Sequence, residues 1–107
     1  MKYLTRQEEI VLLIIYRLGE ISYLMNIKEK LDEITQKDWS LSSVYMPLNK
    51  LTRDGYLSTS LGQPTAKRGG RAIKYYKLTQ KAIDALNEIR SVNLILWEDM
   101  SEIIMEN

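Results

Sequence analysis

The sequence predicts a mainly α-helical fold with one small β-hairpin. Apolar residues recur at helical spacing in four segments of the chain, whereas residues 57–61 and 72–78 show the alternation or the Tyr and Ile content of strands. The hairpin between them is strongly basic. No acidic residue occurs between Asp54 and Asp84, and the bases of that interval are Lys67, Arg68, Arg71, Lys74, Lys77 and Lys81.

The composition limits the classes of function. The chain has 107 residues, a net charge of +1, no Cys and no His, so it lacks the usual general base, the cysteine nucleophile and the commonest zinc ligands. No spacing of the remaining residues forms a nucleophile elbow, a phosphate loop or a carboxylate dyad. We therefore expect a protein that is not an enzyme and has no metal or cofactor. The longest apolar run, residues 10–16, is too short to span a membrane. It does not make a secretion signal, because Glu8 and Glu9 interrupt the start and no small-residue cleavage site follows, so we expect a cytoplasmic protein.

The first two helices are predicted over residues 6–18 and 23–36. Thr5 and Glu8 form a capping-box pattern at the start of the first helix, which is apolar on nearly all sides, and Gly19 suits its end. Residues 21–22 are expected to form a very short strand. The predicted apolar stripe of the second helix consists of Leu24, Ile27, Leu31 and Ile34.

A third helix is predicted over residues 41–52. Its core positions are Leu41, Val44, Leu48 and Leu51, which recur at helical spacing. Pro47 lies past the first turn, where it removes a backbone donor, so we expect a kink or a loose start. The remaining residues point outward or sideways: Ser42, Ser43, Tyr45, Met46, Asn49 and Lys50.

A hairpin with a long basic tip follows, and then a last helix. Thr79 is a plausible N-cap for a helix running to about residue 105. Its apolar positions nearly keep a seven-residue repeat, with Asn93 as the polar member, as in paired helices. The members of this seam are Ala82, Leu86, Ile89, Asn93, Leu96, Met100 and Ile103. Packing of this face on the chain's own domain is the alternative, but about 25 residues of helix, ~38 Å, exceed what a small domain covers.

Three helices, a basic hairpin and a long last helix are the order of a winged helix-turn-helix protein. Residues 41–57 (LSSVYMPLNKLTRDGYL) and 68–79 (RGGRAIKYYKLT) resemble the recognition helix and wing of the PadR-like family of bacterial transcriptional regulators, specifically its short members with a single C-terminal helix. Pro47 falls where that family often has Pro. One departure is Ile21-Ser22-Tyr23, where many members have His-Gly-Tyr.

The resemblance implies a homodimer that binds a pseudo-palindromic operator, most often as a repressor. Residues 1–78 would form the DNA-binding domain and residues 79–107 a dimerisation helix. The expected DNA contacts are Ser42, Ser43, Tyr45, Asn49 and Lys50 on the third helix, with Lys67, Arg68, Arg71 and Lys74 on the wing. A core role for Tyr45 is the alternative, and one of Tyr75 and Tyr76 is expected in the core.

Trp97 near the end of the last helix has two interpretations. In some short members of the family, a Trp at a similar place lines a pocket between subunits and stacks on flat apolar molecules. The resemblance thus implies a planar aromatic effector at Trp97 and Met100, and simple packing in the dimer is the alternative. The expected dimer contacts are Leu86, Ile89, Asn93, Leu96, Trp97, Met100 and Ile103.

A second class of function is compatible with the same pattern. A winged-helix protein-protein interaction module that does not bind DNA would also use a basic loop and a dimerising helix. A charge run is, moreover, often only a solvated surface. Salt-sensitive binding of duplex DNA distinguishes these possibilities.

Overall fold

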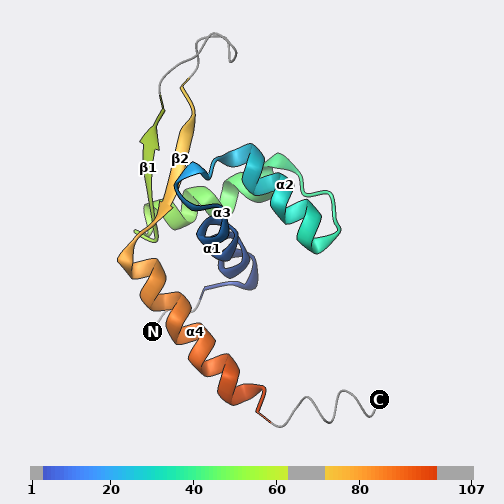
Figure 1. Cartoon of the computed structure of the whole chain (residues 1–107), viewed down its shortest axis with the longest axis vertical. Coiled ribbons are helices and arrows are strands. Elements are labelled where there is room, and N and C mark those ends of the chain that lie inside the picture. The colour runs from blue at the N-terminus through green and yellow to red at the C-terminus, as the bar shows by residue number, and fades with distance from the viewer. Residues whose placement is uncertain (1–3, 63–71, 99–107) are drawn as a thin grey trace.

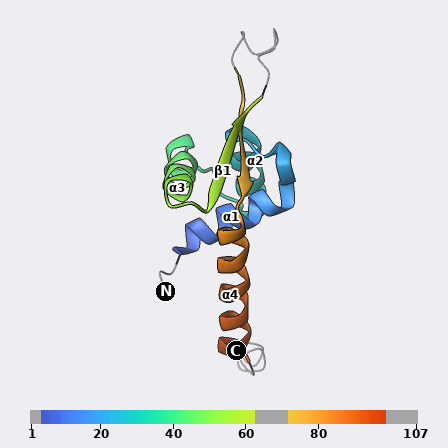
Figure 2. The same cartoon turned by 90° about the vertical axis from the view of Figure 1, so that its left-hand side faces the viewer.

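A computed structural model describes residues 4–62 and 72–98 of the chain. Three helices, α1 (Arg6–Leu18), α2 (Leu24–Thr35) and α3 (Leu41–Arg53), form the body, with a short 3-10 turn, η1 (Gly19–Ile21), after α1. Strands β1 (Leu57–Leu61) and β2 (Lys74–Leu78) form an antiparallel hairpin, and α4 (Gln80–Leu96) follows. The hairpin and α4 extend from opposite ends of the three-helix body (Figures 1 and 2).

The core lies among the three body helices and the base of the hairpin. Helix α1, which the sequence predicts to be apolar on nearly all sides, contributes four buried apolar residues to this core. From α4 only Ala82 is buried, at the first turn. The buried apolar residues are Val11, Leu12, Ile14, Ile15, Ile27, Leu31, Val44, Leu48, Leu51, Tyr56, Leu57, Tyr76 and Ala82.

The ends of α1 follow the sequence prediction. The Thr5 hydroxyl accepts from the Glu8 N–H at 3.1 Å, and Glu8 Oε1 accepts from the Thr5 N–H at 2.7 Å, which completes the capping box. Gly19 ends the helix with a φ of +76°, a conformation that favours glycine.

The predicted strand at residues 21–22 is wrong. Gly19–Ile21 form the turn η1, and the Ser22 hydroxyl donates to the Gly19 carbonyl at 2.6 Å, which closes the turn. This segment meets the sheet through a hydrogen bond from the Tyr76 N–H to the Ser22 carbonyl at 2.9 Å and through an isolated bridge between Tyr23 and Tyr75.

Two predicted core residues are exposed. Ile34, in the last turn of α2, is 52% exposed, and the core contact beside this end of α2 is made by the half-buried Trp39, whose indole N–H bonds the Thr35 hydroxyl. Leu41 is 48% exposed, since the first turn of α3 reaches beyond the core and the helix meets it at Val44.

Helix α3 is continuous through Pro47, and its start is not loose. The Ser40 hydroxyl caps it by accepting from the Ser43 N–H at 3.1 Å. Pro47 leaves the carbonyl of Ser43 without its helical donor, but Ser43 is exposed, so water can bond this carbonyl.

The hairpin and α4 form where the sequence predicts them, but β2 begins two residues later than predicted and α4 is shorter. Strand β2 begins at Lys74, and its register pairs Leu57 with Leu78 and Leu61 with Lys74. Thr79 caps α4 by accepting from the Ala82 N–H at 3.3 Å. The helix ends at Leu96, where the chain tightens into a turn in which the Glu98 N–H bonds the Ile95 carbonyl at 3.2 Å, and the remainder of the predicted span, residues 99–105, lies outside the described residues. Within the described residues, no helix is long and apolar enough to cross a membrane.

Candidate nucleic-acid interface

The outer face of α3 carries polar and amphipathic side chains. Ser42, Ser43 and Asn49 are exposed there, and Tyr45 is 44% exposed. The alternative that Tyr45 is a core aromatic is therefore wrong. Hydroxyl, amide and phenol groups on one helix can bond to both phosphates and base edges.

Hydroxyl groups converge at the start of α3. The Ser40 and Ser43 oxygens are 2.6 Å apart, and Ser40 also lies 3.3 Å from the Ser42 oxygen. These groups surround the N-terminal end of a helix whose backbone N–H groups and dipole favour an anion. Ser42 and Ser43 are thus placed where a phosphate group could be bound, although Ser40 is already engaged as the cap.

Lys50 lies on the same helix but faces a carboxylate. Its Nζ is 2.9 Å from Glu8 Oε2, an atom of a side chain that is only 6% exposed. Burial alone raises the pKa of Glu8, but the hydrogen bonds from the Thr5 backbone and from Lys50 outweigh it, so the pKa of Glu8 lies below its usual value of 4.5. This ion pair between α1 and α3 was not expected from the sequence.

Two basic residues of the wing, Lys74 and Lys77, lie in the described part of the chain. Lys74 is exposed on β2, with Nζ 5.7 Å from the centroid of the Tyr76 ring, and Lys77 Nζ is 3.3 Å from Glu20. Lys67, Arg68 and Arg71 lie outside the described residues.

Of the two adjacent tyrosines on β2, Tyr76 is the core residue. It is 2% exposed, and burial raises the pKa of its phenol, with Tyr45 adding a smaller effect. Tyr75 on the opposite face is half-buried and makes an edge-to-face contact with Tyr23, with ring centroids 6.1 Å apart.

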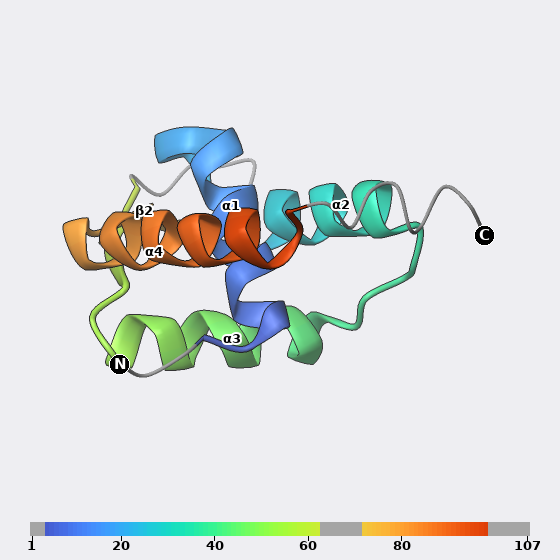
Figure 3. The same cartoon turned by 90° about the horizontal axis from the view of Figure 1, so that it is seen from below.

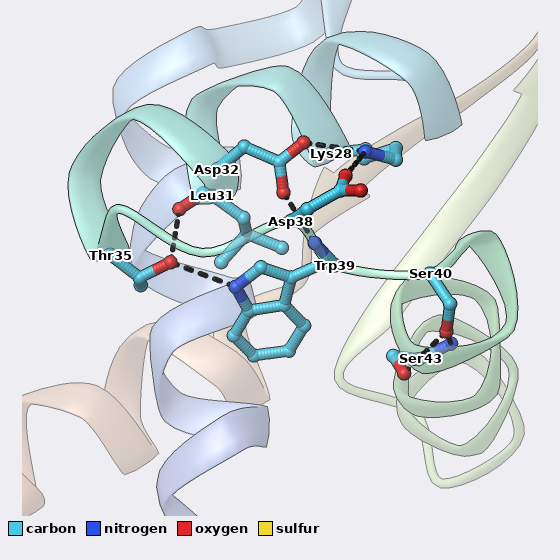
Figure 4. A network of polar contacts seen from close by, with 8 residues as sticks. All are labelled: Lys28, Leu31, Asp32, Thr35, Asp38, Trp39, Ser40 and Ser43. Atoms are coloured by element: carbon cyan, nitrogen blue, oxygen red, sulfur yellow. Dashed lines mark hydrogen bonds and ion pairs between the residues drawn. The ribbon is translucent and has the colours of Figure 1, made fainter.

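The connection between α2 and α3 is held by a polar network (Figure 4). Asp32 accepts from Lys28 Nζ and, at 2.8 Å, from the Trp39 backbone N–H. The Trp39 indole N–H donates to the Thr35 hydroxyl at 2.8 Å. Asp38, just before Trp39, accepts from Lys28 at 3.0 Å. These bonds fix the segment that leads directly into the Ser40 cap of α3.

A groove runs between α1 and α4, which cross in the view from below (Figure 3). Its volume is about 640 Å³. Most of its lining is apolar or amphipathic, with Glu9 and Arg90 as the charged groups. The lining residues are Glu9, Leu13, Tyr16, Ile83, Leu86, Asn87, Arg90, Asn93, Leu94 and Trp97.

The seam predicted on α4 is only partly covered by the chain itself. Leu86, Ile89 and Asn93 are half-buried, whereas Leu96 and Trp97 are 66% and 60% exposed, and Trp97 stands just past the helix end. Met100 and Ile103 lie outside the described residues. Sequence periodicity missed three groove residues. Leu13 and Tyr16 lie beside buried residues on α1, which is apolar on several sides, and Leu94 lies outside the predicted seven-residue repeat of α4.

Comparison with known proteins relates this fold to one group of regulators. A PadR-like transcription factor from Bacteroides fragilis superposes with a TM-score of 0.69 at 27% identity, covering 92% of this chain and 86% of that one. The smu.1704 protein of Streptococcus mutans UA159 gives 0.70 at 26% identity, with coverages of 98% and 94%. A PadR-like transcriptional regulator from Bacillus cereus shares the fold at 0.68 and 23% identity, with coverages of 92% and 87%.

No protein-family model matches the sequence, and no curated protein matches it significantly. The solved structures nevertheless confirm the predicted winged-helix fold and the resemblance to PadR-like regulators. The neighbours named as PadR-like are a transcription factor and a transcriptional regulator, not enzymes, in agreement with the function class predicted from the sequence.

Proposed function

We propose that this chain is a sequence-specific DNA-binding transcriptional regulator that acts as a homodimer on a pseudo-palindromic operator, as a repressor. The observation that supports this most is the exposed face of α3, which carries Ser42, Ser43, Tyr45 and Asn49 beside a basic hairpin. The fold is shared with a PadR-like transcription factor at 27% identity. In this role α3 enters the major groove and the wing contacts the phosphate backbone.

The binding test uses a fluorescently labelled duplex about three helical turns long, taken from the promoter upstream of the chain's own gene. Anisotropy is measured over a range of salt concentrations, with Lys67, Arg68 and Arg71 replaced together by Ala. Because fewer counterions are released, the triple variant should bind every duplex more weakly and show a flatter salt dependence. Arg17→Ala, which removes an exposed charge from the end of α1, is the matched control.

Asn49 gives the sequence-specific half of the test. Asn49→Ala should change the preference among duplexes of different sequence while the salt slope stays close to that of the wild type. A triple wing variant with unchanged affinity and slope would overturn the wing's role. If the wild type fails to bind any duplex at low salt, the protein-interaction alternative remains.

The homodimer is proposed from the surface of α4. Leu94, Ile95, Leu96 and Trp97 are each at least 60% exposed, an unusual run of large apolar groups for a surface helix. We infer that the α4 helices pair and that α4 of one subunit fills the groove beside α1 of the other. The proposed boundary at residue 78 separates a DNA-binding part from a dimerisation part by function and not by packing, because the buried Ala82 joins the first turn of α4 to the core.

Assembly is measured by sedimentation equilibrium. Leu94→Lys places a charge in the groove and should shift the protein toward monomer, whereas Glu88→Lys, at an exposed position of the same helix, should leave the dimer intact. Truncation after Thr79 should leave an aggregating or unfolded chain, because α1 loses its cover. A soluble, folded monomer from that truncation would refute this assembly.

An effector site at Trp97 is the last part of the proposal. Trp97, Asn93 and Leu94 line the groove together with Glu9 of α1, so a planar aromatic cation would find an indole and a carboxylate there. Stacking adds ~0.5–1.5 kcal/mol per aromatic face beyond area burial. Met100 would extend the same site.

Trp97 fluorescence reports this binding. In a Trp39→Phe background, Trp97 is the sole indole, and titration with planar aromatics, cationic and neutral, should quench it. A ligand that releases DNA must also bind more weakly when DNA is present. Unchanged ligand affinity in Trp97→Ala would leave the indole as a packing residue only.

A further inference from the structure

Lys50 is the basic residue that lies on the proposed recognition helix between exposed Asn49 and buried Leu51. A Lys at such a position is ordinarily assigned to a DNA phosphate or a guanine. Here its ammonium is instead 2.9 Å from Glu8 Oε2, at the start of α1. The Lys50 side chain is 40% exposed and that of Glu8 is 6% exposed.

Glu8 is held in place by its own helix. Its Oε1 accepts from the Thr5 N–H at 2.7 Å, while its backbone N–H donates to the Thr5 hydroxyl at 3.1 Å. One oxygen of the carboxylate therefore belongs to the α1 cap, and the other pairs with Lys50 on α3. A group fixed in this way has little freedom to follow Lys50 elsewhere.

Moving Lys50 to a phosphate would leave a buried carboxylate without its cation. Leaving the charge of the buried Glu8 carboxylate uncompensated is unfavourable even though Lys50 is partly exposed, whereas a contact to a phosphate at the protein surface is weakened by salt. The pair with Glu8 is therefore expected to persist in the DNA complex. The guanidinium of nearby Arg6 is paired with Glu9 at 3.1 Å.

We propose that Lys50 does not contact DNA, and that Glu8 acts through Lys50 as a positioning residue that sets the rotation of α3 on α1. The pair holds the side of α3 next to the core, so Asn49 and Tyr45 face outward together. This inference rests on the proposed DNA-binding function for its consequence, but the pairing is testable without DNA.

The first experiment is a double-mutant cycle on urea unfolding of the full chain at fixed concentration, with Glu8→Gln, Lys50→Met and both together. Glu8→Gln retains a side-chain oxygen for the capping box and removes only the charge. We expect the two substitutions to be coupled by about tenfold in the unfolding equilibrium constant, the equivalent of ~1.4 kcal/mol. Glu9→Gln is the matched control and should show no coupling to Lys50→Met.

The pH dependence separates a charge pair from packing. In Lys50→Met, Glu8 keeps its burial but loses the cation, so its pKa rises relative to the wild type. The destabilisation by Lys50→Met should therefore be greatest near neutral pH and shrink as Glu8 becomes protonated in acid. Lys50→Arg should restore wild-type stability. Purely additive substitutions, or destabilisation independent of pH, would overturn the pairing.

The second experiment measures salt-dependent binding to the same promoter duplex. Lys50→Met should retain the wild-type salt slope, while Glu8→Gln should alter the preference among sequences through the altered rotation of α3. If Lys50 contacts a phosphate, the slope falls by ~0.9 per contact, or ~1.8 for a dimer, and the proposal is wrong. If the wild type binds no duplex, the proposed function fails, and the unfolding cycle alone decides the Glu8–Lys50 pair.

Discussion

Thr79 joins the wing to α4, and its hydroxyl makes two bonds there. The oxygen accepts from the Ala82 N–H at 3.3 Å as the N-cap of α4, and the O–H donates to the Gly55 carbonyl at 2.7 Å. Its backbone N–H also bonds the Tyr56 carbonyl at 3.1 Å. Thr79→Ala removes both hydroxyl bonds and leaves the backbone bond, so the joint should weaken without coming apart.

The magnitude follows from the two bonds lost. Removing an N-cap hydroxyl destabilises by ~1 kcal/mol. The bond to Gly55 adds about 0.5 kcal/mol, the low end for a hydrogen bond, because this carbonyl is exposed and water can replace the donor. The sum is about 1.5 kcal/mol, which at roughly 4 °C per kcal/mol lowers Tm by about 6 °C.

Thermal unfolding at one fixed protein concentration measures this change, because the Tm of a dimer depends on concentration. Thr79→Ser keeps the hydroxyl and should stay within about 0.5 kcal/mol of the wild type. Thr52→Ala is the matched control, since it removes a hydroxyl that donates to the Leu48 carbonyl inside α3 and caps nothing. Equal Tm values for Thr79→Ala and Thr79→Ser would refute the capping argument.

Two further predictions concern the network before α3 and the hairpin. The hydrogen bond from Lys28, and then that from the Trp39 N–H, lower the pKa of Asp32 below its usual value of 3.8. The contribution of Asp32 to stability is therefore present above that pH and is lost as the pH falls below it. Asp32→Asn should flatten the decrease of Tm in acid, and an unchanged decrease would contradict this. Gly62→Ala would place a Cβ 2.7 Å from Tyr75 Cε2 and must displace that ring from its contact with Tyr23. The aromatic proton resonances of both tyrosines should shift, and the fold should be destabilised by roughly 1 kcal/mol. Unshifted resonances would show that the hairpin backbone moves instead.

The fold was predictable because its local rules agree with each other. The capping box at Thr5, the positive φ at Gly19 and the cap at Thr79 all occur where side-chain chemistry alone placed them. Local rules fail where tertiary packing decides. Ile34 fits an apolar stripe by spacing, but nothing in the sequence says that it is exposed while Trp39, beyond the end of α2, packs on the core.

The candidate site was predictable in outline but not in its contacts. Periodicity identified the outer face of α3, because buried Val44, Leu48 and Leu51 leave the opposite side free. It could not reveal that Lys50 meets Glu8, since the two residues are 42 positions apart and their pairing depends on how α3 crosses α1. The end of α4 at Leu96 likewise follows from a turn that an apolar repeat does not indicate.

The same contacts suggest how the groove could influence α3. The turn after α3 is tied to α4 by Thr79, which bonds Gly55, and by Lys81, whose Nζ donates to the Asp54 carbonyl at 2.7 Å. The start of α3 is tied to α2 through Trp39 and the Ser40 cap. Because its two ends are attached to different helices, a change in the angle of α4 would act on the C-terminal end of α3 while its N-terminal end stays with α2. Variants at Thr79 and Lys81 should thus alter any effect of a groove ligand on DNA binding more than variants at Asp32 do, whereas equal effects would mean that α3 moves with the body as one unit.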